Sequence, residues 1–316
     1  MGPLWRLVGW RVLLALGTLL FVSVAVFVAT TMLPGDVAEV VLGQSATPEA
    51  IAGLRAAMHL DRPAPVRYLI WLKDLVTGDP GTSLVNKLPV AEMIAGRLPN
   101  SVVLAALSTA LSVPLGLGLG IASAAWRGSG FDRGTNVATL AIISVPEFFV
   151  ATLAVLLFAV QLRWFPALSS PRYDSVASFL RVYTLPVIAL SFIVIAQMMR
   201  MTRAALVDAL RQPYAEMALL KGASRARVVL RHALPNAIGP VANAIALSLS
   251  HLLGGAIVIE TIFNYPGLAR LLVDAVATRD MPLVQACAMI FCGAYLAMVL
   301  LADVAGILSN PRLRYR

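Results

Sequence analysis

The sequence predicts an all-α polytopic membrane protein with six transmembrane helices. Of its 316 residues, 59% are hydrophobic and only 13% are charged, and the mean hydropathy is +0.83. A soluble domain carries about 25% charged residues. The shortage of charge indicates that lipid, rather than water, surrounds much of the chain.

Six long apolar runs supply the predicted helices, because about 20 apolar residues are needed to cross a hydrocarbon core of roughly 30 Å. Five runs contain no Asp, Glu, Lys or Arg, and the other contains only Glu147. The first run is longer than the core of a secretory signal, so we expect it to be retained as a helix. The runs are 12–33, 102–126, 137–162, 182–199, 233–259 and 281–302.

The distribution of basic residues predicts that both termini are cytoplasmic. Segments 1–11, 127–135, 200–232 and 309–316 hold 14 of the 25 Lys and Arg residues, although they are much shorter in total than the hydrophilic segments on the other side. Basic residues are enriched in cytoplasmic loops. An even number of helices also places both termini on one side.

Four regions are predicted along the chain. Residues 1–33 form the N-terminus and the first transmembrane helix, and 34–100 form a helical insertion on the outer side. Residues 101–309 form a five-helix core that includes a cytoplasmic element at 212–235. Residues 310–316 form a cytoplasmic tail.

Two amphipathic helices are expected within the insertion. Pro48 suits the first turn of one helix, which should extend to about His59. A turn cluster follows the second helix at 78–81. The apolar stripe of the second helix comprises Val66, Leu69, Leu72 and Val76.

The segment 212–235 predicts a compact helix–turn–helix. Pro213 suits a helix start, Gly222 suits the left-handed residue that ends a helix, and Ser224 can cap a second helix. The second helix should stop before Pro235. The first helix carries apolar side chains and the second carries basic ones, which fits either a loop that binds anionic lipid headgroups or a dock for a soluble motor subunit. These side chains are Tyr214, Met217, Leu220, Arg225, Arg227 and Arg231.

The same segment resembles the cytoplasmic loop signature of ABC importer permeases. That pattern is Glu-x-Ala, then Gly four residues after the Ala, then Leu-Pro twelve residues after the Gly. Met217 stands where the pattern prefers Ala. The matching residues are Glu216, Ala218, Gly222, Leu234 and Pro235.

Further motifs are similar to the dipeptide/oligopeptide/nickel branch of these permeases. The resemblance runs almost from end to end and is closest to the first of the branch's two permeases, which carries the long outer insertion. The tail differs in having Asn310 where the branch has Asp. The similar segments are 81–83, 97–100, 114–116, 260–263, 266–272, 280–285 and 310–314.

The resemblance implies a type I ABC importer permease in a bacterial inner (plasma) membrane. Its expected partners are a second homologous permease subunit, two ATPase subunits, an extracytoplasmic solute-binding protein and membrane lipids. ATP and Mg would bind to the ATPase subunits, and no catalytic residue, metal site or cofactor is expected in this chain. Short peptides are the first expectation for the solute, with nickel complexes, glutathione-like molecules and sugars as alternatives. The implied ATPase contacts are Tyr214, Glu216, Met217, Ala218, Leu220, Gly222, Arg225, Leu234 and Pro235.

Polar residues within the apolar runs are candidates for contacts with the pathway or with a partner, because such groups are costly in lipid. Glu147 is the first candidate, Glu260 suits a structural role equally well, and Asp303 is expected to pair with an arginine near the inner headgroups. A membrane enzyme or a nucleic-acid binder is not favoured, because the sequence has no carboxylate–histidine cluster and no basic stripe with aromatic residues. The pathway candidates are Glu147, Gln197, Asn243, His251 and Glu260.

Overall fold

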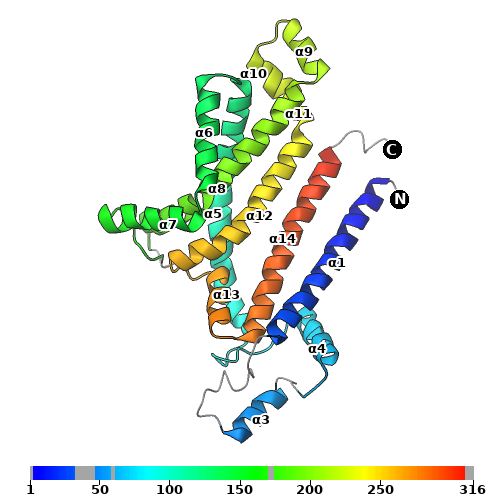
Figure 1. Cartoon of the computed structure of the whole chain (residues 1–316), viewed down its shortest axis with the longest axis vertical. Helices are drawn as coiled ribbons and strands as arrows, with labels where there is room; N and C mark the ends of the chain where they lie inside the picture. The colour runs from blue at the N-terminus through cyan, green and yellow to red at the C-terminus, as the bar shows by residue number, and fades with distance from the viewer. Residues whose placement is uncertain (1–2, 33–46, 58–60, 170–173, 310–316) are drawn as a thin grey trace. The chain divides into compact units, whose positions relative to one another are not determined.

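The computed structural model of the chain describes residues 3–32, 47–57, 61–169 and 174–309. Within these residues every regular element is a helix, apart from one isolated bridge between Thr82 and Pro89 (Figure 1). This confirms the predicted all-α polytopic fold. Five helices are long and apolar enough to cross a membrane: α1 (Pro3–Thr31), α5 (Val90–Ala125), α8 (Val176–Leu210), α12 (Ile238–Ile262) and α14 (Met281–Ser309).

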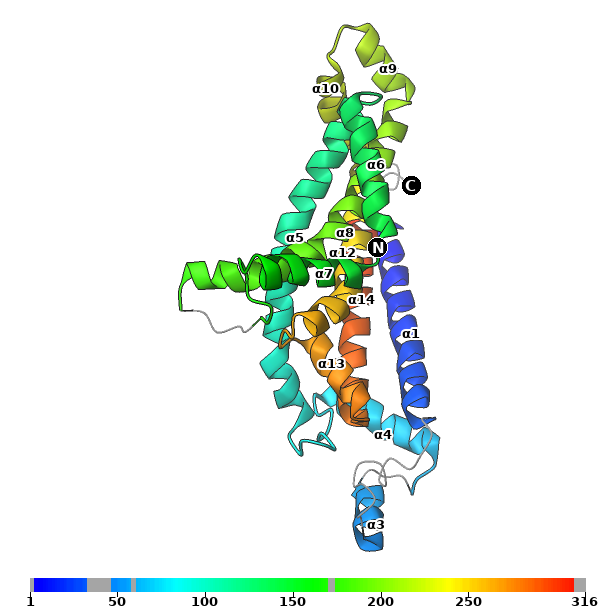
Figure 2. The same cartoon turned by 60° about the vertical axis from the view of Figure 1, so that its left-hand side comes forward.

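The remaining apolar run is bent rather than straight. α6 (Gly130–Ser144) and α7 (Glu147–Ala154), which continues into the π-helical segment η1 (Val155–Gln161), meet at an angle of 95° (Figure 2). Val145 precedes a proline and is extended, with φ −94° and ψ 128°. A residue before proline is sterically disfavoured from the helical region. The uninterrupted helix expected over 137–162 is therefore corrected to a bent pair, which completes the six spans if it counts as one.

The chain divides into two compact units. Unit 1 contains Met1–Leu13, Val102–Tyr265 and Tyr295–Arg316, and unit 2 contains Leu14–Ser101 and Pro266–Ala294. α5 begins at Val90, so the helix continues across the 100–101 boundary predicted between the insertion and the core.

The core of unit 1 is built around α8, which packs against α6, α7 and α12. Its largest cluster brings aromatic residues from α8 together with the end of α12. The Tyr265 hydroxyl donates to the Tyr183 hydroxyl at 3.2 Å. Fully or almost fully buried members of this cluster are Leu104, Leu190, Val194, Met198, Ile259 and Phe263.

Two glycines allow α5 to approach α8 closely. A Cβ at Gly116 would lie 2.9 Å from the Cβ of Met198, and one at Gly120 would lie 2.7 Å from the Cβ of Thr202. A Cβ at Gly118 would meet nothing within 4 Å. Of these three glycines, the first and the last therefore permit the close packing of the two helices.

In unit 2, α4 (Ala64–Thr77) packs on α1. The Tyr68 hydroxyl lies 2.8 Å from Ser23 Oγ, and the rings of Tyr68 and Phe27 lie 5.5 Å apart. The other helix of the insertion, α3 (Pro48–Ala57), begins at the predicted proline, and its expected end at His59 lies outside the described residues.

Unit 2 also contains α13 (Leu268–Ala277), which packs with the start of α14 and the start of α5. Asp280 lies between α13 and α14 and joins them to the segment before α5. Its carboxylate accepts hydrogen bonds from the Ser83 hydroxyl and, at 3.1 Å, from the backbone N–H of Leu84.

Candidate coupling element and pathway residues

The segment between α8 and α12 forms the predicted helix–turn–helix. α9 (Pro213–Leu220) begins with proline in its first turn and ends at Gly222, whose φ is +82°. The N–H of Gly222 donates to the carbonyl of Leu219 at 2.9 Å, and that of Ala223 donates to Ala218 at 3.1 Å. These two bonds form a Schellman motif, which requires a left-handed residue at the glycine position.

The second helix of the element, α10 (Arg225–Val228), begins at the predicted cap. Ser224 Oγ accepts from the N–H of Arg227 at 3.4 Å. In Figures 1 and 2, α9 and α10 lie beyond the end of α8. The turn is thus fixed by backbone and cap bonds on both sides of Gly222.

The outer face of α9 carries apolar side chains that unit 1 does not cover. Met217 is 54% exposed and Leu220 is 76% exposed. Ala215 is fully buried and anchors the opposite face. The same helix–turn–helix also carries the exposed charged residues Glu216, Arg225, Arg227 and Arg231.

The helical path continues beyond the point where the sequence predicted a stop. α10 leads into a π-helical segment, η2 (Val229–Ala233), and then into α11 (Leu234–Asn236). A proline inside an α-helix lacks a donor and clashes with the preceding turn. In the wider π turn the N–H of Leu234 donates to Val229, five residues back. The expected helix end before Pro235 is therefore wrong: Leu234 is half-buried and Pro235 is exposed within a continuing helix.

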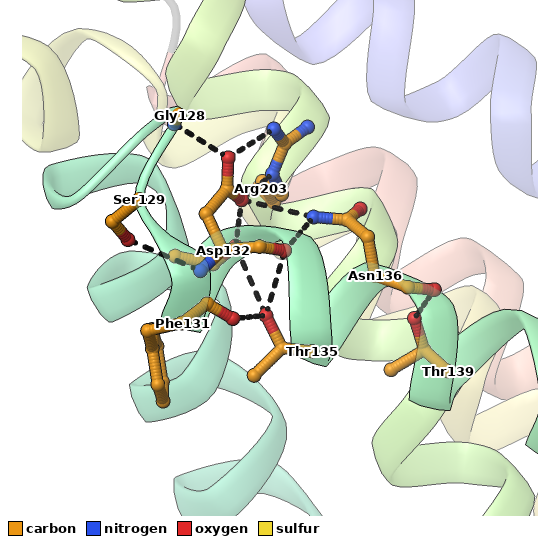
Figure 3. A network of polar contacts seen from close by, with 9 residues as sticks. Gly128, Ser129, Phe131, Asp132, Thr135, Asn136, Thr139 and Arg203 are labelled. Carbon is orange, nitrogen blue, oxygen red and sulfur yellow. Dashed lines mark hydrogen bonds and ion pairs between the residues drawn. The ribbon is translucent and has the colours of Figure 1, made fainter.

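An ion pair that the sequence analysis did not single out holds the turn between α5 and α6 against α8 (Figure 3). Arg203 donates to the Asp132 carboxylate from Nε at 2.7 Å and from Nη2 at 2.9 Å. The carboxylate also accepts from Ser123 Oγ at 2.5 Å, Gly128 N at 2.9 Å and Asn136 Nδ2 at 2.9 Å. Asp132 is only 4% exposed, so these bonds replace nearly all of its hydration.

The arginine of this ion pair lies on α8, the helix that leads into the helix–turn–helix. Arg203 precedes Pro213 by ten residues of α8 and its C-terminal turn, which is about 15 Å of helix. The sequence contained a signal for this ion pair, because Asp132 is the only acidic residue in the basic segment 127–135. The predicted pairing of Asp303 with an arginine is confirmed: Arg11 Nη1 lies 2.8 Å from Asp303 Oδ2.

Glu147 lies at the 95° bend, in the first turn of α7. Its carboxylate covers Gly255 of α12, where an added Cβ would collide with Oε1 and would lie 2.9 Å from Leu190 Cδ1. Glu147 is half-buried. Across the described part of the chain, its carboxylate has no hydrogen-bond or ion-pair partner.

The other pathway candidates lie in different surroundings and do not form one cluster. Gln197 is half-buried on α8, and Asn243 and His251 are exposed on α12. Glu260 is fully buried near the end of α12. Within the described ranges, no group of three His, Cys, Asp or Glu side chains is placed to hold a metal ion.

Comparison with known proteins identifies the chain's family. The model for the inner membrane component of binding-protein-dependent transport systems matches residues 116–315, and the model for the N-terminal part of such membrane components matches residues 4–105. The chain belongs to this permease family. It is a multi-pass inner-membrane permease of an ABC importer, and its family works with separate ATPase and solute-binding proteins.

Related permeases match the chain over nearly its whole length. A putative peptide transport system permease protein of Brucella abortus (strain 2308) is 39% identical over 307 residues, which cover 96% of this chain and 98% of the relative. A probable peptide ABC transporter permease protein of Sinorhizobium fredii is 34% identical, with the same coverage. A glutathione transport system permease protein of Salmonella choleraesuis is 38% identical over 306 residues, which cover 97% of this chain and 98% of the relative.

Proposed function

We propose that this permease forms half of a translocation pathway for short peptides, and that residues 213–232 couple it to the ATPase subunits of the importer. The observation that carries the coupling assignment is α9 itself. It presents Met217 and Leu220 to the exterior on a helix whose end is fixed by the left-handed Gly222. Apolar side chains held on a rigid helix suit insertion into a groove of a partner.

A lipid anchor is the competing explanation for the same element. Its basic residues would bind anionic headgroups, and each would contribute a similar, additive amount. A protein dock instead depends on the shape of α9 and its turn. The Schellman bonds at Gly222 and the buried anchor at Ala215 favour the dock, because lipid binding requires no fixed turn.

We further propose that a second permease subunit covers one face of α12. Exposed residues recur there every three or four positions, as on one side of a helix. Two of them, Asn243 and His251, are polar in the middle of an apolar span, where facing lipid is costly. A partner helix or a water-filled pathway would satisfy both side chains. The exposed positions of α12 that share this spacing are Pro240, Asn243, Leu247, His251 and Gly254.

The remaining parts of the proposal follow the importer scheme. Two ATPase subunits bind ATP and Mg on the cytoplasmic side, where both termini of this chain also lie. Short peptides are the proposed solute because two of the relatives above are named as peptide permeases. Glutathione, itself a small peptide, is the named solute of the third.

Affinity purification of the tagged chain from its native membrane, in mild detergent, tests the assembly. We expect a second six-span permease and ATPase subunits to co-purify, and the complex in proteoliposomes to take up radiolabelled trialanine with ATP and its binding protein. Repeated recovery of the chain alone at good yield would contradict the proposal.

Charge reversal separates the dock from the lipid anchor. The test variants are Arg225→Glu and Gly222→Val, each with membrane insertion measured alongside uptake. A dock predicts the larger loss of uptake at Gly222. A lipid anchor predicts the larger loss at Arg225 and little change at Gly222.

A further inference from the structure

Glu147 occupies a site that the coupling mechanism does not use. It is an acidic residue at the break of a bent apolar span, and among the described residues it has no polar partner. Intramembrane carboxylates face a cavity or a counter-charge, because lipid does not solvate them. The folded chain therefore leaves this carboxylate available to a cation from outside the chain.

The Glu147 carboxylate lies against α8 and α12. Gly255 is buried on α12, and the absence of a side chain there gives the carboxylate room. Leu190 forms an apolar wall beside it. The kink at Val145–Pro146 bends the chain by 95° between α6 and α7, and α7 then packs against α8 and α12.

No lysine or arginine of these helices reaches the carboxylate. On α8 the nearest arginines to Leu190 are Arg181 and Arg200, nine and ten residues away, or about 14–15 Å along the axis. Arg181 donates to the carbonyl of Trp164. α12 contains no Lys or Arg.

The depth of the site suits a solute that enters from the outer side. Gly255 lies seven residues before the end of α12 at Ile262, which is about 10 Å of helix. In the proposed orientation that end of α12 is the outer end. The same helix carries the exposed polar residues Asn243 and His251 on its way to the coupling element.

We propose that Glu147 is a cation subsite of the translocation pathway that binds the α-ammonium group of a peptide in transit. This inference rests on the proposed function. A single carboxylate suits an ammonium group better than a metal ion, since within the described ranges Glu147 belongs to no group of three or more His, Cys, Asp or Glu that could hold a metal. Charge-assisted hydrogen bonds of this kind are stronger than neutral ones, so they discriminate a free amino terminus from a blocked one.

The test compares two peptides in the reconstituted complex: trialanine and N-acetyltrialanine. Each uptake rate for Glu147→Gln is divided by the wild-type rate for the same peptide, so that the preference of the unchanged binding protein cancels. We expect Glu147→Gln to lower trialanine uptake about tenfold, since a charged hydrogen bond is lost, and to leave N-acetyltrialanine unchanged. Glu147→Asp, which keeps the charge, should give a trialanine uptake rate between those of the wild type and of Glu147→Gln.

Glu260→Gln is the matched control, because Glu260 is also an intramembrane acid of unit 1 but is fully buried. It should change uptake of both peptides by the same factor. An equal loss of both peptides in Glu147→Gln would overturn the inference and indicate a structural role or a contact with the partner permease. Normal trialanine uptake by Glu147→Gln would also overturn it. If the wild-type complex shows no ATP-dependent uptake, the proposed function fails instead.

A labelling measurement tests the site independently of the binding protein. Glu147→Cys is placed in a background with Cys287→Ser and Cys292→Ser, which removes the natural thiols. A positively charged methanethiosulfonate reagent should label the new thiol, and trialanine with its binding protein should slow the labelling. Absence of labelling in every nucleotide state would show that the position does not face an aqueous pathway, and would overturn the inference.

Discussion

Loss of the Asp132–Arg203 ion pair should destabilise unit 1 by an amount that the structure allows us to calculate. Removing one partner of a buried ion pair costs about 3–5 kcal/mol. Arg203→Met leaves the Asp132 carboxylate with the neutral donors Ser123, Gly128 and Asn136, so we expect the lower end, about 3 kcal/mol. Asp132→Asn leaves a cation whose side chain is 24% exposed and can be partly hydrated, so we expect about 2 kcal/mol.

The double variant distinguishes a direct interaction from two separate defects. Independent costs would add to about 5 kcal/mol, whereas removing both charges together avoids an unpaired buried charge and should cost about 3 kcal/mol. The expected coupling energy is therefore about 2 kcal/mol. The assay is the free energy of unfolding from SDS titration in mixed micelles.

The exposed pair Asp208–Arg211 is the control for this cycle. Its charges lie 3.7 Å apart with side chains 75% and 64% exposed, so its loss should change stability by less than about 1 kcal/mol. Additive costs at Asp132 and Arg203, or single-variant costs as small as those of the control pair, would refute the reasoning.

Two further substitutions test the turn and the helix packing. Gly222→Val forces a β-branched residue to φ +82°, at a cost of about 1–2 kcal/mol in the turn. It should abolish energised uptake while the chain remains inserted in the membrane. Normal uptake would contradict the coupling role. Gly134→Ala, on α6 with open space around it, is its control and should transport normally. Gly120→Ala should lower the free energy of unfolding by about 1–3 kcal/mol, because the added Cβ meets Thr202. Gly118→Ala on the same helix is the control and should leave it unchanged, because nothing lies within 4 Å of that position. Equal effects of the two substitutions in SDS titration would contradict the close approach of α5 and α8.

Much of the fold could be predicted because apolar length and turn chemistry are local properties. Five of the six apolar runs correspond to single long helices, and Pro213, Gly222 and Ser224 occupy the positions expected for them. These features depend on neighbouring residues alone. They are therefore readable in the sequence.

The features that were missed depend on contacts between distant residues. The bend at Val145–Pro146 looked like a continuous apolar run, because hydropathy does not register a change of direction. The π turn that lets the helix continue through Pro235 is a rearrangement of backbone hydrogen bonds, which the amino-acid composition of the segment does not reveal. Asp132 and Arg203 are 71 residues apart, and no local pattern joins them.

The sequence defined some of the predicted site residues better than others. The residues predicted to contact the ATPase lie close together in the sequence and form one helix–turn–helix. Glu147 and Glu260 looked alike as acids in apolar runs. Their burial separates them, since Glu147 is partly exposed at a bend and Glu260 is fully enclosed.

The central claim is that α9 contacts the ATPase, and site-specific photocrosslinking tests it most directly. A benzophenone amino acid replaces Leu220, which is 76% exposed on α9, in the assembled complex. The control position is Val137, which is 67% exposed on α6. We expect an adduct with an ATPase subunit from position 220 and none from position 137. The absence of an ATPase adduct from position 220, in a complex that still hydrolyses ATP, would contradict the account.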